Sequence, residues 1–128
     1  MTFARRVYLW AGIWGLLVIV PGFFNEPAIA RTQPPPITHP EYFYGFYTTA
    51  LAFQVLFLLI SRDPVRYRPL MPVCMLEKFG FVLACTILLA LGRIPRLIVV
   101  FSVVDFIFGL FFVAAFMKTK GAQMAPSA

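Results

Sequence analysis

Hydrophobic residues fall into four long blocks along the chain, and short polar segments separate them. A transmembrane helix needs about 20 mostly apolar residues, within a range of roughly 17–25. The four blocks, at residues 7–24, 43–60, 73–91 and 97–117, have that length. Because hydrocarbon leaves no partner for free backbone groups, the blocks predict four membrane-spanning helices. We therefore expect an all-α, integral membrane four-helix bundle that forms a single domain over residues 1–128.

The prolines and capping residues between the blocks support these boundaries. The prolines stand almost entirely between the blocks, where they do not interrupt a helix. Only Pro21 lies inside one, near the end of the first, where it is expected to kink or end the helix. Thr38-His39-Pro40-Glu41 has the spacing of a capping box and predicts the start of the second helix. Small residues spaced four apart, Ala11/Gly15, Gly45/Thr49 and Gly80/Ala84, predict close helix packing.

The composition excludes an ordinary soluble enzyme. Hydrophobic residues make up 61% of the chain and charged residues 12%, whereas soluble domains have about 45–50% apolar and about 25% charged residues. Too little polar surface remains to cover a water-soluble globule of this size. The same numbers exclude a disordered chain.

The distribution of basic residues predicts how the chain is oriented in the membrane and which lipids it contacts. Eleven Lys and Arg against five Asp and Glu give a net charge of +6. With the N-terminus inside, seven of these basic residues lie in cytoplasmic segments and three in external loops, which favours both termini in the cytoplasm. Anionic lipid headgroups are then the expected partner, rather than nucleic acid. The turn that carries Arg62, Arg66 and Arg68 is expected to bind them or to close the cytoplasmic face.

An alternative exists for the first block. Arg5-Arg6, an apolar core and Ala28-Ile29-Ala30 together have the outline of a secretory signal with a cleavage site. The block is longer than the roughly 7–15 residues usual for such a signal, and Glu26 and two prolines lie near the cut. These features favour a retained span.

Ionisable groups inside a span are functional candidates, because burying them is costly. Asp105 lies near the middle of the fourth block, Glu77 and Lys78 lie in the third, and Gln54 lies in the second. Asp105 is expected either to carry protons or contact a ligand, or to lock two helices together through Gln54. Glu77 is expected to pair with Arg66 or Arg68, while Lys78 reaches back to the membrane interface.

An apolar pocket is a further possibility in the fourth block. Phe101, Phe108 and Phe112 share the Asp105 face, with Gly109 leaving a gap beside them. Such a pocket, with Gln54 and Asp105 as its polar groups, would suit a sterol-like, quinone or other hydrophobic ligand. Packing against lipid and neighbouring helices explains the same phenylalanines more simply.

Catalytic candidates are few: Asp105, Glu77 and His39, the only histidine. A lone histidine cannot supply bis-imidazole haem ligation, and no His, Cys or carboxylate cluster has metal-ligand spacing. The turn at Asp63-Pro64 lacks phosphate-loop glycines. We therefore expect no metal and no cofactor, and His39 is expected to be a surface residue at a capped helix start.

Five segments carry a resemblance: AGIWGLLVIVP, HPEYFYGFYTTALAFQ, RDPVRYRPLM, LEKFGF and DFIFGLFF. With them the chain resembles a class of short four-span bacterial membrane proteins to which no activity attaches. In architecture it is also similar to the DoxX-like four-span group and to the sterol-isomerase and sigma-2 receptor-like group. The last of these places acidic residues in an intramembrane pocket, but no catalytic position transfers to this chain residue by residue. The resemblance implies a bacterial cytoplasmic (inner) membrane protein.

Two functions remain open. The first is non-enzymatic: a small membrane subunit that binds partners or apolar molecules through its helix faces, with another membrane protein or a second copy as a possible partner. The second is a membrane-embedded enzyme or carrier, isomerase- or oxidoreductase-like, that handles a hydrophobic substrate with its intramembrane carboxyls. A channel is less favoured, because the spans lack a polar stripe.

Overall fold

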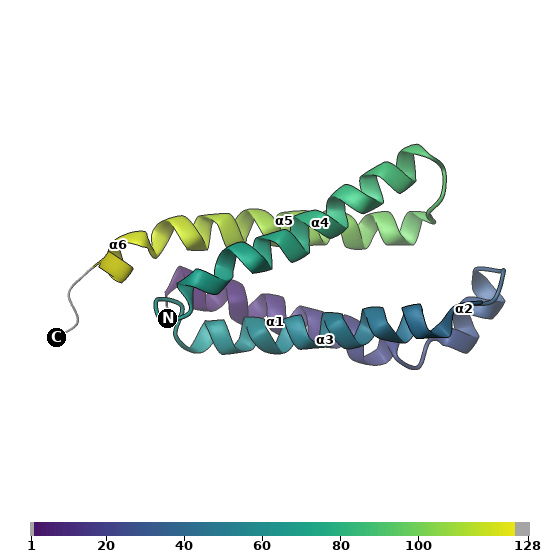
Figure 1. The fold of residues 1–128 in the computed structure, drawn as a ribbon, viewed down its shortest axis with the longest axis horizontal. Helices are drawn as coiled ribbons and strands as arrows, with labels where there is room; N and C mark the ends of the chain where they lie inside the picture. The colour runs from purple at the N-terminus through teal and green to yellow at the C-terminus, as the bar shows by residue number, and fades with distance from the viewer. Residues whose placement is uncertain (1, 125–128) are drawn as a thin grey trace.

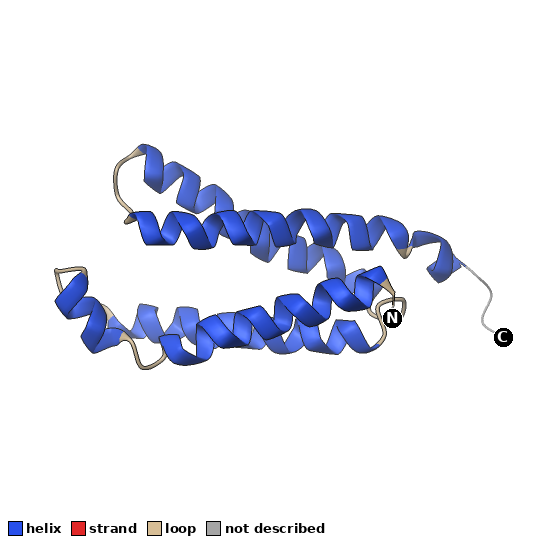
Figure 2. Ribbon diagram, turned by 180° about the vertical axis from the view of Figure 1, so that it is seen from behind, coloured by secondary structure: helices blue, strands red, loops and turns tan. Residues whose placement is uncertain are grey.

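A computed structural model describes residues 2–124, and within them the chain consists of helices and short connections (Figure 2). Four long helices match the four predicted blocks: α1 (Phe3–Gly22), α3 (Pro40–Arg62), α4 (Met71–Ala90) and α5 (Arg96–Lys118). Each is long and apolar enough to cross a membrane, with mean hydropathies of 1.5 to 2.7 in their apolar segments. The prediction of a helical chain with four such helices is confirmed.

Three short helices join or follow these four. They are α2 (Glu26–Thr32), the 3₁₀ turn η1 (Arg68–Leu70) and α6 (Lys120–Met124). The sequence did not predict α2, which contains Ala28-Ile29-Ala30. It is fixed to α3 by the Tyr44 hydroxyl, which donates to Glu26 Oε2 at 2.7 Å. Its last turn is closed by Thr32 Oγ1, which donates to the carbonyl of Ala28.

The helix starts follow local chemistry. Thr2 caps α1 by accepting the backbone N–H of Arg5 at 3.3 Å, and α1 ends at Gly22, directly after Pro21, as expected. The predicted capping box at Thr38 is wrong. His39 is the N-cap of α3 without a side-chain cap bond, and its Nδ1 lies 3.3 Å from Glu41 Oε1. Pro40 explains the difference, because proline at the first helical position has no N–H that needs an acceptor and already has a helical φ.

The long helices form two antiparallel hairpins (Figure 1). In the first, α1 packs against α3, and in the second α4 packs against α5, while α1 and α5 join the two hairpins. Gly92 makes the turn after α4 at φ +67°, a conformation that side chains disfavour. The start of α1 and α6 lie at one end of the molecule and α2 at the other (Figure 1).

The hydrophobic core lies at the end of the bundle where α1 begins. Tyr8 stacks on Phe112 with ring centroids 4.4 Å apart, and Phe57 meets Phe112 edge-on at 5.1 Å. All three side chains are fully buried, together with Ile60 and Met71. Helices α1, α3 and α5 therefore meet through aromatic packing at this end, and α4 begins against it.

Helices pack closely at some glycine positions and not at others. A Cβ on Gly12 would lie 2.6 Å from Leu58 and 3.2 Å from the backbone carbonyl of Gln54, so α1 and α3 touch there. Gly45 and Gly80 have nothing within 4 Å of such an atom, so the packing predicted at those two positions is wrong. The gap expected at Gly109 is also closed, because the ring of Phe79 lies against it.

The contact at Gly12 generates a stability prediction. Gly12→Ala forces a methyl group against backbone as well as side chain, and overpacking of this kind costs about 1–3 kcal/mol. Gly80→Ala puts the same methyl into open space, where alanine favours a helix by up to about 1 kcal/mol. Thermal unfolding in mild detergent should show a lower melting temperature for the first variant and an equal or higher one for the second. Equal melting temperatures would contradict the close α1–α3 contact.

Candidate functional site

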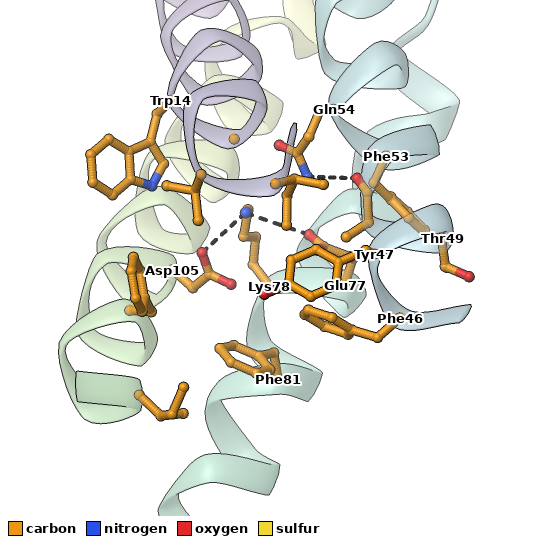
Figure 3. Close-up of a pocket in the computed structure, with 16 residues that line it drawn as sticks. Trp14, Phe46, Tyr47, Thr49, Phe53, Gln54, Glu77, Lys78, Phe81 and Asp105 are labelled. Carbon is orange, nitrogen blue, oxygen red and sulfur yellow. Dashed lines mark hydrogen bonds and ion pairs between the residues drawn. The ribbon is translucent and has the colours of Figure 1, made fainter. Parts of the chain in front are cut away.

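A cavity of about 290 Å³ lies between the two hairpins. All four long helices line it, and aromatic side chains form much of its wall (Figure 3). The aromatic lining residues are Trp14, Phe46, Tyr47, Phe53, Phe81 and Phe101. Trp14 is 38% and Phe46 51% exposed, so the cavity opens to the outside of the bundle beside them.

Three charged side chains meet at this cavity. Lys78 Nζ of α4 donates to Asp105 Oδ1 of α5 at 3.1 Å, and it lies 3.7 Å from Glu77 Oε2. The lysine side chain is 5% exposed, against 18% for Asp105 and 20% for Glu77. Figure 3 shows the ammonium between the two carboxylates. The group is therefore a buried, charge-paired cluster, with two carboxylates for one cation.

The cluster stands between the cavity and the hydrophobic core. On the core side, Lys78 Nζ lies 5.2 Å from the ring centroid of Phe57 and 5.9 Å from that of Phe108. Ring faces attract a cation at such distances. The ammonium thus has carboxylates on one side and aromatic faces on the other, which compensates for its removal from water.

This arrangement corrects three expectations. Asp105 pairs with Lys78 rather than with Gln54. Lys78 is buried and does not reach back to an interface. The ion pair of Glu77 is with Lys78 and not with a loop arginine. Adjacent helical residues point about 100° apart, yet both Glu77 and Lys78 line the cavity because it spreads over that part of α4.

Gln54 contributes a fourth polar group to the cavity wall. It is 3% exposed, and its Nε2 donates to the carbonyl of Ala50 in its own helix at 2.8 Å. Its Oε1 lies against Gly15, where no side chain would fit. This oxygen, Glu77 Oε2 and the Tyr8 hydroxyl in the core are buried without a hydrogen-bond partner among the described residues. Of the two lining oxygens, Glu77 Oε2 still lies 3.7 Å from Lys78 Nζ, whereas Gln54 Oε1 is enclosed between α3 and α1.

The other predicted site residues are divided between different surroundings. Phe101 lines the cavity together with Gln54 and Asp105. Phe112 lies in the core instead, and Phe108 packs against that core. His39 is 68% exposed at the start of α3 and does not line the cavity.

The basic turn is partly used by the fold itself. Arg68 Nη2 donates to the carbonyl of Phe116 at 3.0 Å, and Arg68 Nε donates to Thr119 Oγ1 at 3.2 Å. Its guanidinium also lies 3.7 Å from the ring centroid of Phe116. Arg68 therefore caps the end of α5, whereas Arg62 and Arg66 are exposed. Headgroup binding stays a prediction for this turn.

Sequence reasoning missed several lining residues, above all Trp14, Phe46, Tyr47 and Phe81. One usable signal was available for the cluster: the third and fourth apolar blocks, which form α4 and α5, are consecutive and carry charges of opposite sign. Consecutive antiparallel helices are neighbours, so Lys78 and Asp105 were candidates for a pair.

In the described part of the chain, no three His, Cys, Asp or Glu residues lie close enough together to hold a metal ion.

Comparison with protein-family models, with curated protein sequences and with solved structures finds no match to this chain. The site must therefore be interpreted from its own geometry. That geometry suits binding: an apolar, aromatic space that ends at a compact polar group.

The ion pair generates a double-mutant prediction. Lys78→Met leaves two buried carboxylates without a cation, and breaking a buried pair from one side costs about 3–5 kcal/mol. In Lys78→Met/Asp105→Leu the loss should be smaller than the sum of the single losses, by about 0.5–3 kcal/mol. Denaturation in detergent measures each value. Lys120→Met, at an exposed lysine, is the control and should change stability little; strict additivity of the two cluster substitutions would refute the pair.

Proposed function

We propose that this chain is a four-span integral protein of a bacterial cytoplasmic membrane, with both termini in the cytoplasm. The length and hydropathy of the four helices support insertion. The excess of Lys and Arg in the segments at the α1 start, the α3–α4 turn and the α5 end supports the orientation. Exposed leucines on these helices also support membrane insertion: Leu17, Leu76 and Leu83 are each more than 60% exposed.

Within that membrane, we infer that the protein binds an apolar molecule in the cavity between its hairpins. The observation that carries this function is the cavity itself, which has aromatic walls, includes the exposed side chains Trp14 and Phe46, and has three charged side chains in its lining. Binding sites typically combine a mostly apolar lining with a few convergent polar groups. Trp14 and Phe46 belong both to the cavity wall and to the outer surface that lipid would cover, which supports a route from the bilayer for a hydrophobic molecule.

The alternative function is a membrane-embedded enzyme or carrier for a hydrophobic substrate. It is supported by the two carboxylates, Glu77 and Asp105, that line the cavity beside a protonated amine. A carboxylate and an ammonium in contact are able to exchange a proton. Binding alone needs no such exchange, and the geometry supports binding more directly.

The binding function predicts a co-purifying molecule that depends on the cavity. Val18 lines the cavity on α1, whereas Val20, two residues on, is 45% exposed and does not. Native mass spectrometry of the wild-type protein, extracted from its own membrane in mild detergent, should detect an apolar molecule near one-to-one stoichiometry. Val18→Phe fills the cavity and should lose most of it, while Val20→Phe should retain it.

Two results would contradict this function. One is a wild-type protein that carries only bulk lipid or a partner chain, which would favour a subunit that acts through its helix faces. The other is equal retention of the bound molecule by Val18→Phe and Val20→Phe, which would put the molecule elsewhere on the surface.

A further inference from the structure

The cavity's polar groups restrict which molecules it accepts. Lys78 is the only cationic side chain in the lining, and it is already engaged by Asp105 at 3.1 Å and Glu77 at 3.7 Å. With both carboxylates ionised the cluster carries a net charge of −1. An anionic head group, such as a fatty-acid carboxylate, would find its one possible partner occupied and would face two like charges in a low dielectric.

The hydrogen-bonding balance of the same lining points the same way. Glu77 and Asp105 line the cavity with 20% and 18% of their side chains exposed, so both carboxylates offer acceptor oxygens to a molecule inside it. A carboxylate that exchanges water for a ligand needs a donor in the water's place, because an unsatisfied buried polar atom is costly. A ligand with a donor at its polar end would remove that cost, whereas an acceptor-only ligand would not.

The aromatic wall adds a preference for the body of the ligand. The rings that line the cavity offer faces to a flat or cationic molecule. The volume of about 290 Å³ lies at the small end of known ligand sites. The occupant is therefore small, or inserts only one part of itself.

We propose that the cavity selects an apolar molecule whose polar end donates hydrogen bonds and bears no negative charge, a protonated amine above all and a hydroxyl next. This selectivity rests on the proposed binding function, since it concerns the same cavity. Its observable basis is the pair of carboxylates, Glu77 and Asp105, that line the cavity beside a single cation, Lys78.

A matched series of probes tests the selectivity. The four compounds are 2-naphthylmethylamine, 2-naphthalenemethanol, its methyl ether and 2-naphthylacetate, which share one bicyclic body. Full-length protein in zwitterionic phosphatidylcholine nanodiscs is dialysed against empty nanodiscs at pH 7, so that partition into lipid cancels. We expect the amine to bind at least tenfold more tightly than the acid, with the alcohol between them and tighter than the ether.

Two variants test whether the cluster of Glu77, Lys78 and Asp105 causes this preference. Glu77→Gln removes one negative charge at nearly constant shape, so the ratio of amine to acid affinity should fall several-fold. Glu41→Gln makes the same change at an exposed carboxylate outside the cavity and should leave the ratio unchanged. A ratio that is insensitive to Glu77→Gln, or that responds equally to Glu41→Gln, would overturn the proposal.

The remaining outcomes separate the two claims. If all four compounds bind equally, or the acid binds tightest, the donor preference is wrong while apolar binding stands. If none of them binds the wild type more than it binds Val18→Phe, the binding function itself fails, and the preference with it.

Discussion

The structure depends on the carboxylates and aromatic rings that compensate the buried charge of Lys78. A lysine charge inside hydrocarbon is costly unless it is paired, and Lys78 is 5% exposed in the middle of the bundle. Its compensation comes from Asp105 across the α4–α5 contact, from Glu77 beside it and from the ring faces of Phe57 and Phe108. Since the partners come from α3, α4 and α5, the charge fixes how these helices face one another.

The cluster also divides the bundle into two unlike halves. On one side, Tyr8, Phe57 and Phe112 pack face and edge into a closed core. On the other, the hairpins enclose a cavity with a mouth. A packed half can keep the ion pair in place while the open half admits a molecule, so stability and binding need not compete for the same residues. Glu77 and Asp105 line the open side, where 20% and 18% of their side chains are exposed.

Sequence reasoning reached the helices but only part of the site. Long apolar blocks predict helices because both length and hydropathy are local properties, whereas α2 is too short to have such a pattern. The expectation that Lys78 reaches back to the membrane interface was wrong because the long flexible stem of a lysine also lets it reach a carboxylate on the next helix, here Asp105. Phe101 and Phe112 do share a face of α5. However, eleven residues span about 16 Å along the axis, so one ring reaches the cavity and the other the core.

The most direct test measures the ion pair in a bilayer. The chain has three lysines and two aspartates, so solid-state NMR with ¹⁵Nζ-lysine and ¹³Cγ-aspartate labels resolves few pairs. Dipolar recoupling should detect one short Nζ–carboxyl contact, consistent with the 3.1 Å N–O distance of Lys78 and Asp105. That contact should disappear in Asp105→Asn and persist in Asp63→Asn. A spectrum without a short contact, or one that loses it only in Asp63→Asn, would contradict the account.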